Sequence, residues 1–298
     1  MLITRKEEAL VLMEARRRGS CSLRGIGLNA AFVALLFGAS YAAQADSAVI
    51  LGSGHVGNWI TTGFVANPNA SPSELIVAPS PILSSGGAST CSLPEECPSY
   101  DVSFPALGSG TLPFAFTGFK FGTVYVTQSA KVAPTQAFPI VQASLSEQDA
   151  CRSANTLRIL QRSVDIPVIL LSKLIAANLS TLNFPRVMTF PEAIGRGVFT
   201  NLVLGNIQRA DGIPGEDLPL LLELFDFQGN LVGSTSLTLS YGETRVVGDV
   251  SFLGAPGFFY GGQLRVTRVS GKALLWGILY TNDDEFGITA STGANLSP

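Results

Sequence analysis

The chain has 298 residues, of which 46% are hydrophobic and only 14% charged, and its formal net charge is −3 at pH 7. This charged share lies well below the roughly 25% typical of soluble domains, which excludes a charge-rich disordered tail. The 31 glycines and 17 prolines favour a turn-rich β protein over a helix bundle. With His55 as the single histidine, most histidine-based catalysis and metal binding are excluded as well.

The first 45 residues resemble a bacterial secretory signal. Arg16 to Arg18 precede an uncharged run, Gly25–Ala45, with the apolar stretch Ala30–Phe37 inside it. The run ends in a small-x-small pattern of the kind that signal peptidase reads. We therefore expect a signal peptide over residues 1–45 and a mature chain that begins at Asp46 and is secreted, periplasmic or on the cell surface. The alternative is an uncleaved anchor, because the run is just long enough to span a bilayer, and this leader would then be the only contact with the membrane.

Next in the chain, two stretches of the first unit recur in a second unit at a spacing of about 140 residues. Val56–Asn67 matches Ile194–Asn206 in its glycine, threonine and closing asparagine. Gly122–Gln128 matches Gly262–Arg268. The repeat predicts a first domain over residues 46–146 and a second over residues 185–298.

Within each unit the apolar residues alternate with polar ones, as Val124 and Val126 do in the first and Leu264 and Val266 in the second. A period of two is typical of strands with one buried face. The sequence thus predicts a mainly β fold made of two tandem antiparallel β-sandwiches, Ig-like or jelly-roll-like. Residues 147–184 are expected to be a partly helical connector, with one helix capped by Ser146–Asp149 and another opening at Asp165.

The first unit differs from the second by an insertion rich in Ser, Gly and Pro, at residues 79–99. Cys91 and Cys97 bracket a short loop within it. Because export permits disulfides, we expect these two cysteines to be joined and Cys151 to be left over. Three free thiols are the alternative.

In the second unit, the phrase Phe199–Asn206, the later Gly262–Val266 and the final apolar strand are similar to uncharacterised tandem β-sandwich modules in exported proteins of environmental bacteria. The resemblance implies a noncatalytic extracellular role and brings no established ligand with it.

Acidic residues of the second unit gather in two loops and are the candidates for a ligand or calcium site. Calcium prefers several oxygen ligands from a flexible loop, so a site is expected if the two loops converge. The favoured alternative is a pair of solvated, charged turns, and no other cofactor is expected. The candidates are Asp211, Glu216, Asp217, Asn282, Asp283, Asp284 and Glu285.

The aromatic run Phe258, Phe259 and Tyr260 lies in a Gly/Pro-rich stretch and is the candidate for an exposed binding patch. Packing between the sheets is the favoured alternative for this run. Trp276, within an apolar strand, is expected in the core.

We hypothesise a secreted or cell-surface protein that binds or assembles and does not catalyse. Its partners would be an extracellular glycan or protein, or further copies of itself; scattered basic residues predict no nucleic-acid binding. One alternative is an exported hydrolase that acts on polysaccharide through carboxylates. The other is a self-assembling surface or fibre subunit, in which an unpaired strand of one copy completes the sheet of the next.

Overall fold

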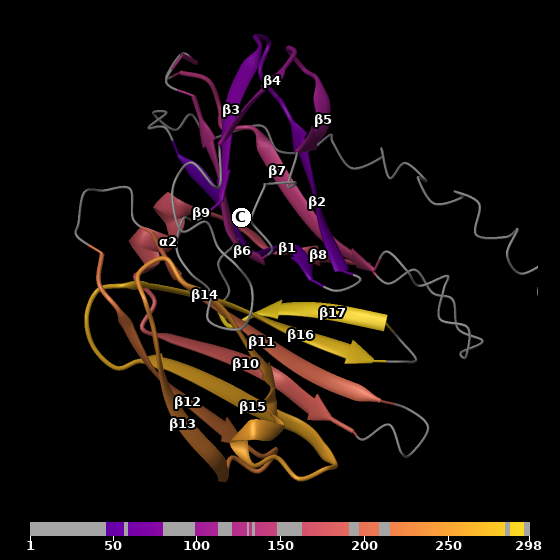
Figure 1. Ribbon diagram of the computed structural model, residues 1–298, viewed down its shortest axis with the longest axis vertical. Helices are drawn as coiled ribbons and strands as arrows, with labels where there is room; N and C mark the ends of the chain where they lie inside the picture. The colour runs from indigo at the N-terminus through magenta and orange to yellow at the C-terminus, as the bar shows by residue number, and fades with distance from the viewer. Residues whose placement is uncertain are drawn as a thin grey trace, which may run out of the picture. The chain divides into compact units, whose positions relative to one another are not determined.

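The computed structural model describes residues 46–56, 59–79, 99–112, 121–129, 131–132, 135–147, 163–190, 197–208, 215–283 and 287–294. Across these ranges the chain is mainly β, and every strand pair is antiparallel (Figure 1). The mainly β class predicted from alternating residues is therefore confirmed.

The first half forms a nine-stranded sheet of order β4-β3-β6-β1-β2-β7-β8, with β5 paired to β2 and β9 to β1. Its strands are β1 (Ser47–Val56), β2 (Trp59–Ala66), β3 (Ser73–Pro79), β4 (Tyr100–Phe104), β5 (Ser109–Leu112), β6 (Phe121–Gln128), β7 (Ile140–Glu147), β8 (Ser163–Ile166) and β9 (Val168–Leu170). The last residues of β1 leave β6 and pair with β2, which divides the sheet into the parts β4-β3-β6-β1 and β5-β2-β7-β8. Buried residues from both parts, such as Val126 and Val65, share one core.

The second half forms two four-stranded sheets, β10-β15-β12-β13 and β14-β11-β16-β17. Its strands are β10 (Thr181–Thr189), β11 (Val198–Ile207), β12 (Leu218–Phe225), β13 (Leu231–Leu239), β14 (Thr244–Asp249), β15 (Phe259–Arg268), β16 (Leu274–Asp283) and β17 (Gly287–Thr292), with the 3-10 helix η3 (Val250–Leu253) between β14 and β15. Leu264 and Val266, predicted to face inward, are fully buried in the core between these sheets.

The two halves pair their strands in the same order. The parts β4-β3-β6-β1 and β5-β2-β7-β8 correspond to β13-β12-β15-β10 and β14-β11-β16-β17, so that β1 to β8 take the places of β10 to β17. Each of β1 and β10 also shifts register around a left-handed residue, which is Gly52 (φ 73°) in one and Arg186 (φ 62°) in the other. The two halves thus share a strand order and the position of a bulge.

A buried asparagine closes one corner of the first half. Asn67, which follows β2, is 2% exposed. Its Nδ2 donates to the carbonyl oxygens of Ser71 and Pro105, both at 2.9 Å, and its backbone N–H donates to the Gly108 carbonyl at 2.8 Å. One amide thereby joins the end of β2 to the loop before β3 and to the turn between β4 and β5.

Asn206 makes the equivalent bonds in the second half. It is 1% exposed, and its Nδ2 donates to the carbonyl oxygens of Glu216 (2.9 Å) and Ser240 (3.1 Å). Its backbone N–H donates to the carbonyl of Glu243, the residue before β14, at 2.9 Å. The closing asparagine of the sequence repeat is thus a buried amide that satisfies carbonyl groups which would otherwise lose water without a partner.

The central strands β11 and β16 of the sheet β14-β11-β16-β17 are buried on both faces. Leu275 and Leu279 of β16 join the core of the second half, whereas Trp276 and Ile278 on the opposite face join the core of the first half. As a result, all residues from Leu274 to Tyr280 are buried and the alternation disappears. Trp276 is 1% exposed, as expected for a core residue.

Contacts of β1 and β6 complete this shared layer. A Cβ on Gly205 of β11 would lie 2.6 Å from Cδ1 of Leu51, so the absence of a side chain there lets β1 approach. The hydroxyls of Thr123 and Thr244 share a hydrogen bond of 2.7 Å. The described residues of both halves fall in one compact unit.

The stretch between the halves differs from the expected connector. Residues 163–170 form β8 and β9, which pair with β7 and β1, because their β-branched residues complete the first sheet. The helix α2 begins only at Leu171 and ends at Ala177. Ser146 lies in β7 and not at a helix cap. Residues 148–162 and all four cysteines lie outside the described residues, so the disulfide stays a prediction.

Replacing Asn206 with Ala should lower the free energy of unfolding by about 2–3 kcal/mol, because the substitution leaves buried carbonyl groups without a donor. Chemical denaturation measures this change. The matched control is Asn183→Ala on the exposed face of β10, where we expect a change within about 0.5 kcal/mol. Equal midpoints for Asn206→Ala and the unsubstituted chain would contradict the assigned role of this amide.

Candidate functional site

The described residues of the two acidic loops, Glu216 with Asp217 and Asn282 with Asp283, lie apart. Glu216 and Asp217 are exposed, and a carboxylate oxygen of Glu216 accepts the backbone N–H of Lys272, just before β16 begins. Asp283 lies at the other end of β16, opposite Val198. A strand of this length extends about 30 Å, so Glu216 and Asp283 are too far apart to bind one ion together.

The remaining acidic candidates can be placed only in part. Asn282 and Asp283 are half-buried at the end of β16, whereas Asp211, Asp284 and Glu285 lie outside the described residues. Within the described ranges, no group of three or more His, Cys, Asp or Glu residues is placed to hold a metal ion. A calcium ion at the turn after β16 stays a prediction.

The aromatic run of the second half is exposed at two of its three positions. The exposed fractions are 63% for Phe258 and 65% for Tyr260, but only 5% for Phe259. Phe259 is therefore a correction to the predicted patch. Side chains alternate across a strand, so when β15 begins at Phe259 its ring points into the core and Tyr260 points away from it.

Phe190, at the end of β10, completes an aromatic surface that we define as Phe190, Phe258 and Tyr260. The Phe190 ring centroid lies 4.5 Å from that of Phe258 and 6.1 Å from that of Tyr260, with interplanar angles of 35° and 13°. Sequence analysis missed Phe190, because its place beside the run depends on the pairing of Thr189 with Phe259. The repeat alone does not supply that pairing.

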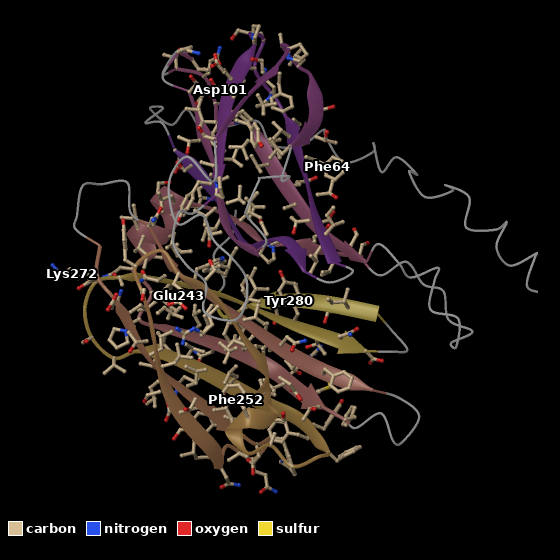
Figure 2. The ribbon with its side chains drawn as sticks, viewed as in Figure 1. Phe64, Asp101, Glu243, Phe252, Lys272 and Tyr280 are labelled. Carbon is tan, nitrogen blue, oxygen red and sulfur yellow. The ribbon has the colours of Figure 1, made fainter. Side chains whose placement is uncertain are left out.

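Two further phenylalanines are exposed near the same strand ends. Phe227, in the turn between β12 and β13, is 76% exposed and approaches Gly261, the residue after Tyr260. Phe252, on η3, is 45% exposed (Figure 2). The aromatic surface is thus bordered by additional apolar area.

Beyond Tyr260, the outer face of the sheet β10-β15-β12-β13 carries an ion pair beside apolar side chains of β12. Arg265 of β15 donates to Glu223 of β12 at 2.9 Å, and its guanidinium lies 4.7 Å from the centroid of the Phe225 ring. This pairing of charge, carboxylate and aromatic face suits a solvated surface.

The turn that presents Phe227 is held by Asp226. Its carboxylate accepts the side-chain amide of Asn230 at 3.0 Å and the backbone N–H groups of Asn230 and Gln228 at 2.8 and 2.9 Å. These hydrogen bonds stabilise the ionised form and hold the pKa of Asp226 below its ordinary value.

Two tyrosines near the shared layer have a raised pKa, whereas that of Asp226 is lowered. Desolvation raises the pKa of Tyr280 and of Tyr125, although the Tyr125 hydroxyl oxygen also accepts the backbone N–H of Gln208 at 2.8 Å. Both phenols therefore stay protonated across the physiological range.

The described helices include none whose length and apolar character would suit a membrane crossing.

A carboxyl titration by NMR should place the pKa of Asp226 below that of an ordinary exposed aspartate, and Asn230→Ala should raise it. Because the pKa is lowered on folding, the stabilisation from this turn is present above the unfolded-state pKa and is lost as the pH falls through the folded-state pKa. An unshifted titration in the unsubstituted chain would contradict the hydrogen bonds described for this turn.

No protein-family model matches the chain, and the search of curated proteins finds no similar sequence.

Proposed function

We propose that the chain is an exported, noncatalytic binding protein whose aromatic surface stacks against the ring faces of an extracellular glycan. The exposure of Phe258 and Tyr260 beside Phe190 carries this proposal. Covering exposed aromatic rings with a ligand removes apolar surface from water, which is favourable, and a cluster of exposed rings is typical of a binding surface.

The geometry of the rings favours a flat, partly apolar ligand. The Phe190 and Tyr260 rings are within 13° of parallel, so they offer similarly oriented faces to one ligand. A pyranose ring presents a face of C–H groups to such a platform and hydroxyl groups at its rim. The Tyr260 hydroxyl supplies a polar group that can bond to that rim while its ring remains in apolar contact.

The arrangement of the acidic residues supports a noncatalytic role. Hydrolysis of a glycosidic bond by a carboxylate pair requires the two groups to flank one bond, at a separation of roughly 5–10 Å. Glu216 and Asp283 lie at opposite ends of β16. A polysaccharide hydrolase based on these residues is therefore the weaker proposal.

We further propose that the two halves are tandem repeats of one β-sandwich module and that the chain is exported after removal of residues 1–45. The identical strand order and the paired Asn67 and Asn206 bonds support the duplication. Unlike most tandem modules, the halves share a sheet whose central strands are buried on both faces, so we expect them to unfold together.

Binding to the glycan should depend on the aromatic surface. The double variant Phe258→Ser/Tyr260→Ser should weaken retention on insoluble cellulose, chitin or peptidoglycan by about tenfold or more, because the stacking area is lost. The control Val269→Ser removes an apolar side chain of similar exposure, 62%, from the turn that follows the opposite end of β15, and should bind as the unsubstituted chain does. Retention on none of these polysaccharides, or equal retention by the double variant, would contradict the proposal.

The expected coupling of the halves can be measured with the two tryptophans of the chain. Trp276→Phe leaves Trp59 of β2 as the only tryptophan, and Trp59→Phe leaves Trp276 of β16. Denaturant unfolding followed by fluorescence should reach its midpoint at the same concentration as unfolding followed by circular dichroism in each variant. Separate transitions for the two reporters would show that the halves unfold independently.

A further inference from the structure

The free edge of β13 differs from the other edges of the described sheets. β13 has nine residues, Leu231–Leu239, and contains neither a charged residue nor a proline. Figure 1 shows it at the edge of its sheet, next to β12 alone. Long, uncharged edge strands present backbone N–H and C=O groups to any further strand. Proteins commonly prevent such pairing with a charged residue, a proline, a bulge, a short strand or a covering element.

The other edge strands of the second half contain a proline, a bulge or charged residues, or lie against the first half. β10, at the opposite edge of the same sheet, contains Pro185 and the bulge at Arg186. β14 carries Arg245 and Asp249 and has a register shift, and β17 lies next to β8. In the first half, β5, β8 and β9 have four residues or fewer, and β4 carries the exposed Asp101. β13 is the long described edge without such protection.

Hydrogen bonds fix which groups of β13 face outward. The carbonyl of Pro219 in β12 accepts the N–H of Val269 at 2.9 Å, so Pro219 directs its backbone polar group away from β13. Thr238, which lies opposite Pro219, therefore directs its own N–H and C=O to the free edge. Arg245 Nη2 confirms this direction, because it donates to the Thr238 carbonyl at 3.0 Å.

Because these directions alternate along a strand, Ser236 and Ser234 also present their N–H and C=O groups to the edge. Both residues are exposed. Arg245, held by a 2.8 Å ion pair to the buried Glu243, covers only the end of the edge at Thr238. The central residues of β13 thus offer two complete sets of backbone donors and acceptors.

We propose that β13 pairs antiparallel with β13 of a second copy of the chain, about a two-fold axis at Thr235. This axis places Ser234 of each copy opposite Ser236 of the other, which gives two equivalent pairs. Each pair then exchanges two N–H···O=C bonds, which joins the two four-stranded sheets into one. The absence of charge on β13 means that no like charges meet across the axis. A second copy suits this edge because each strand supplies the partner that the other lacks.

Sedimentation velocity of the purified chain over a range of concentrations tests this proposal. We expect a monomer–dimer equilibrium for the unsubstituted chain. Ser236→Pro removes one outward N–H per copy without removing a bond to β12, and it should weaken dimerisation by at least about tenfold. If this variant fails to fold by circular dichroism, Ser236→Lys replaces it, since two lysines near the axis repel each other.

Two further chains separate this contact from other routes to association. Val269→Lys adds the same charge outside β13 and should dimerise normally. Phe258→Ser/Tyr260→Ser should also dimerise normally, because its changes affect the glycan proposal and not the edge. A monomer at every concentration, unaltered dimerisation of the folded Ser236 variant, or loss of the dimer only in the aromatic variant would each overturn the proposed pairing.

Discussion

The central strands β11 and β16 of the sheet β14-β11-β16-β17 are apolar on both faces, and the rest of the fold depends on this constraint. Leu275 and Leu279 of β16 pack against β10-β15-β12-β13, while Trp276 and Ile278 pack against the first half. A sheet with a single buried face needs one partner layer, whereas this sheet needs two. Without the first half, the second half would therefore expose apolar side chains of this sheet to water.

The two halves are alike at one internal corner and differ at the faces of corresponding strands. Asn67 and Asn206 keep the same bonds, because the corner they close is internal to each half. Phe64 on β2 is 47% exposed, whereas Val203 on the corresponding strand β11 is 4% exposed (Figure 2). Faces that end a stack of repeats meet water and become polar, and faces between repeats become apolar.

The two proposed contacts lie on one sheet. The aromatic surface is at the ends of β10 and β15, and the free edge is β13, all within β10-β15-β12-β13. The outer face of this sheet carries the Arg265–Glu223 ion pair, which is in contact with water. Phe258 and Tyr260 are exposed, and among the described strands β13 pairs with β12 alone, which is the physical reason to propose a ligand for the rings and a second copy for the edge.

The sequence by itself determined the mainly β class and the inward positions of Leu264 and Val266, because alternation is a local pattern that shows which side chains of a strand are buried. It favoured core packing for the aromatic run, so the exposure of Phe258 and Tyr260 was decided by the tertiary structure. It did not determine that Phe259 is buried, since that depends on where β15 begins. Nor could it place Phe190 beside the run or separate Glu216 from Asp283, because strand pairing brings distant residues together or holds them apart. Only the tertiary structure decided that Leu274–Tyr280 is buried on both faces, since a continuous apolar run does not say which layers cover it.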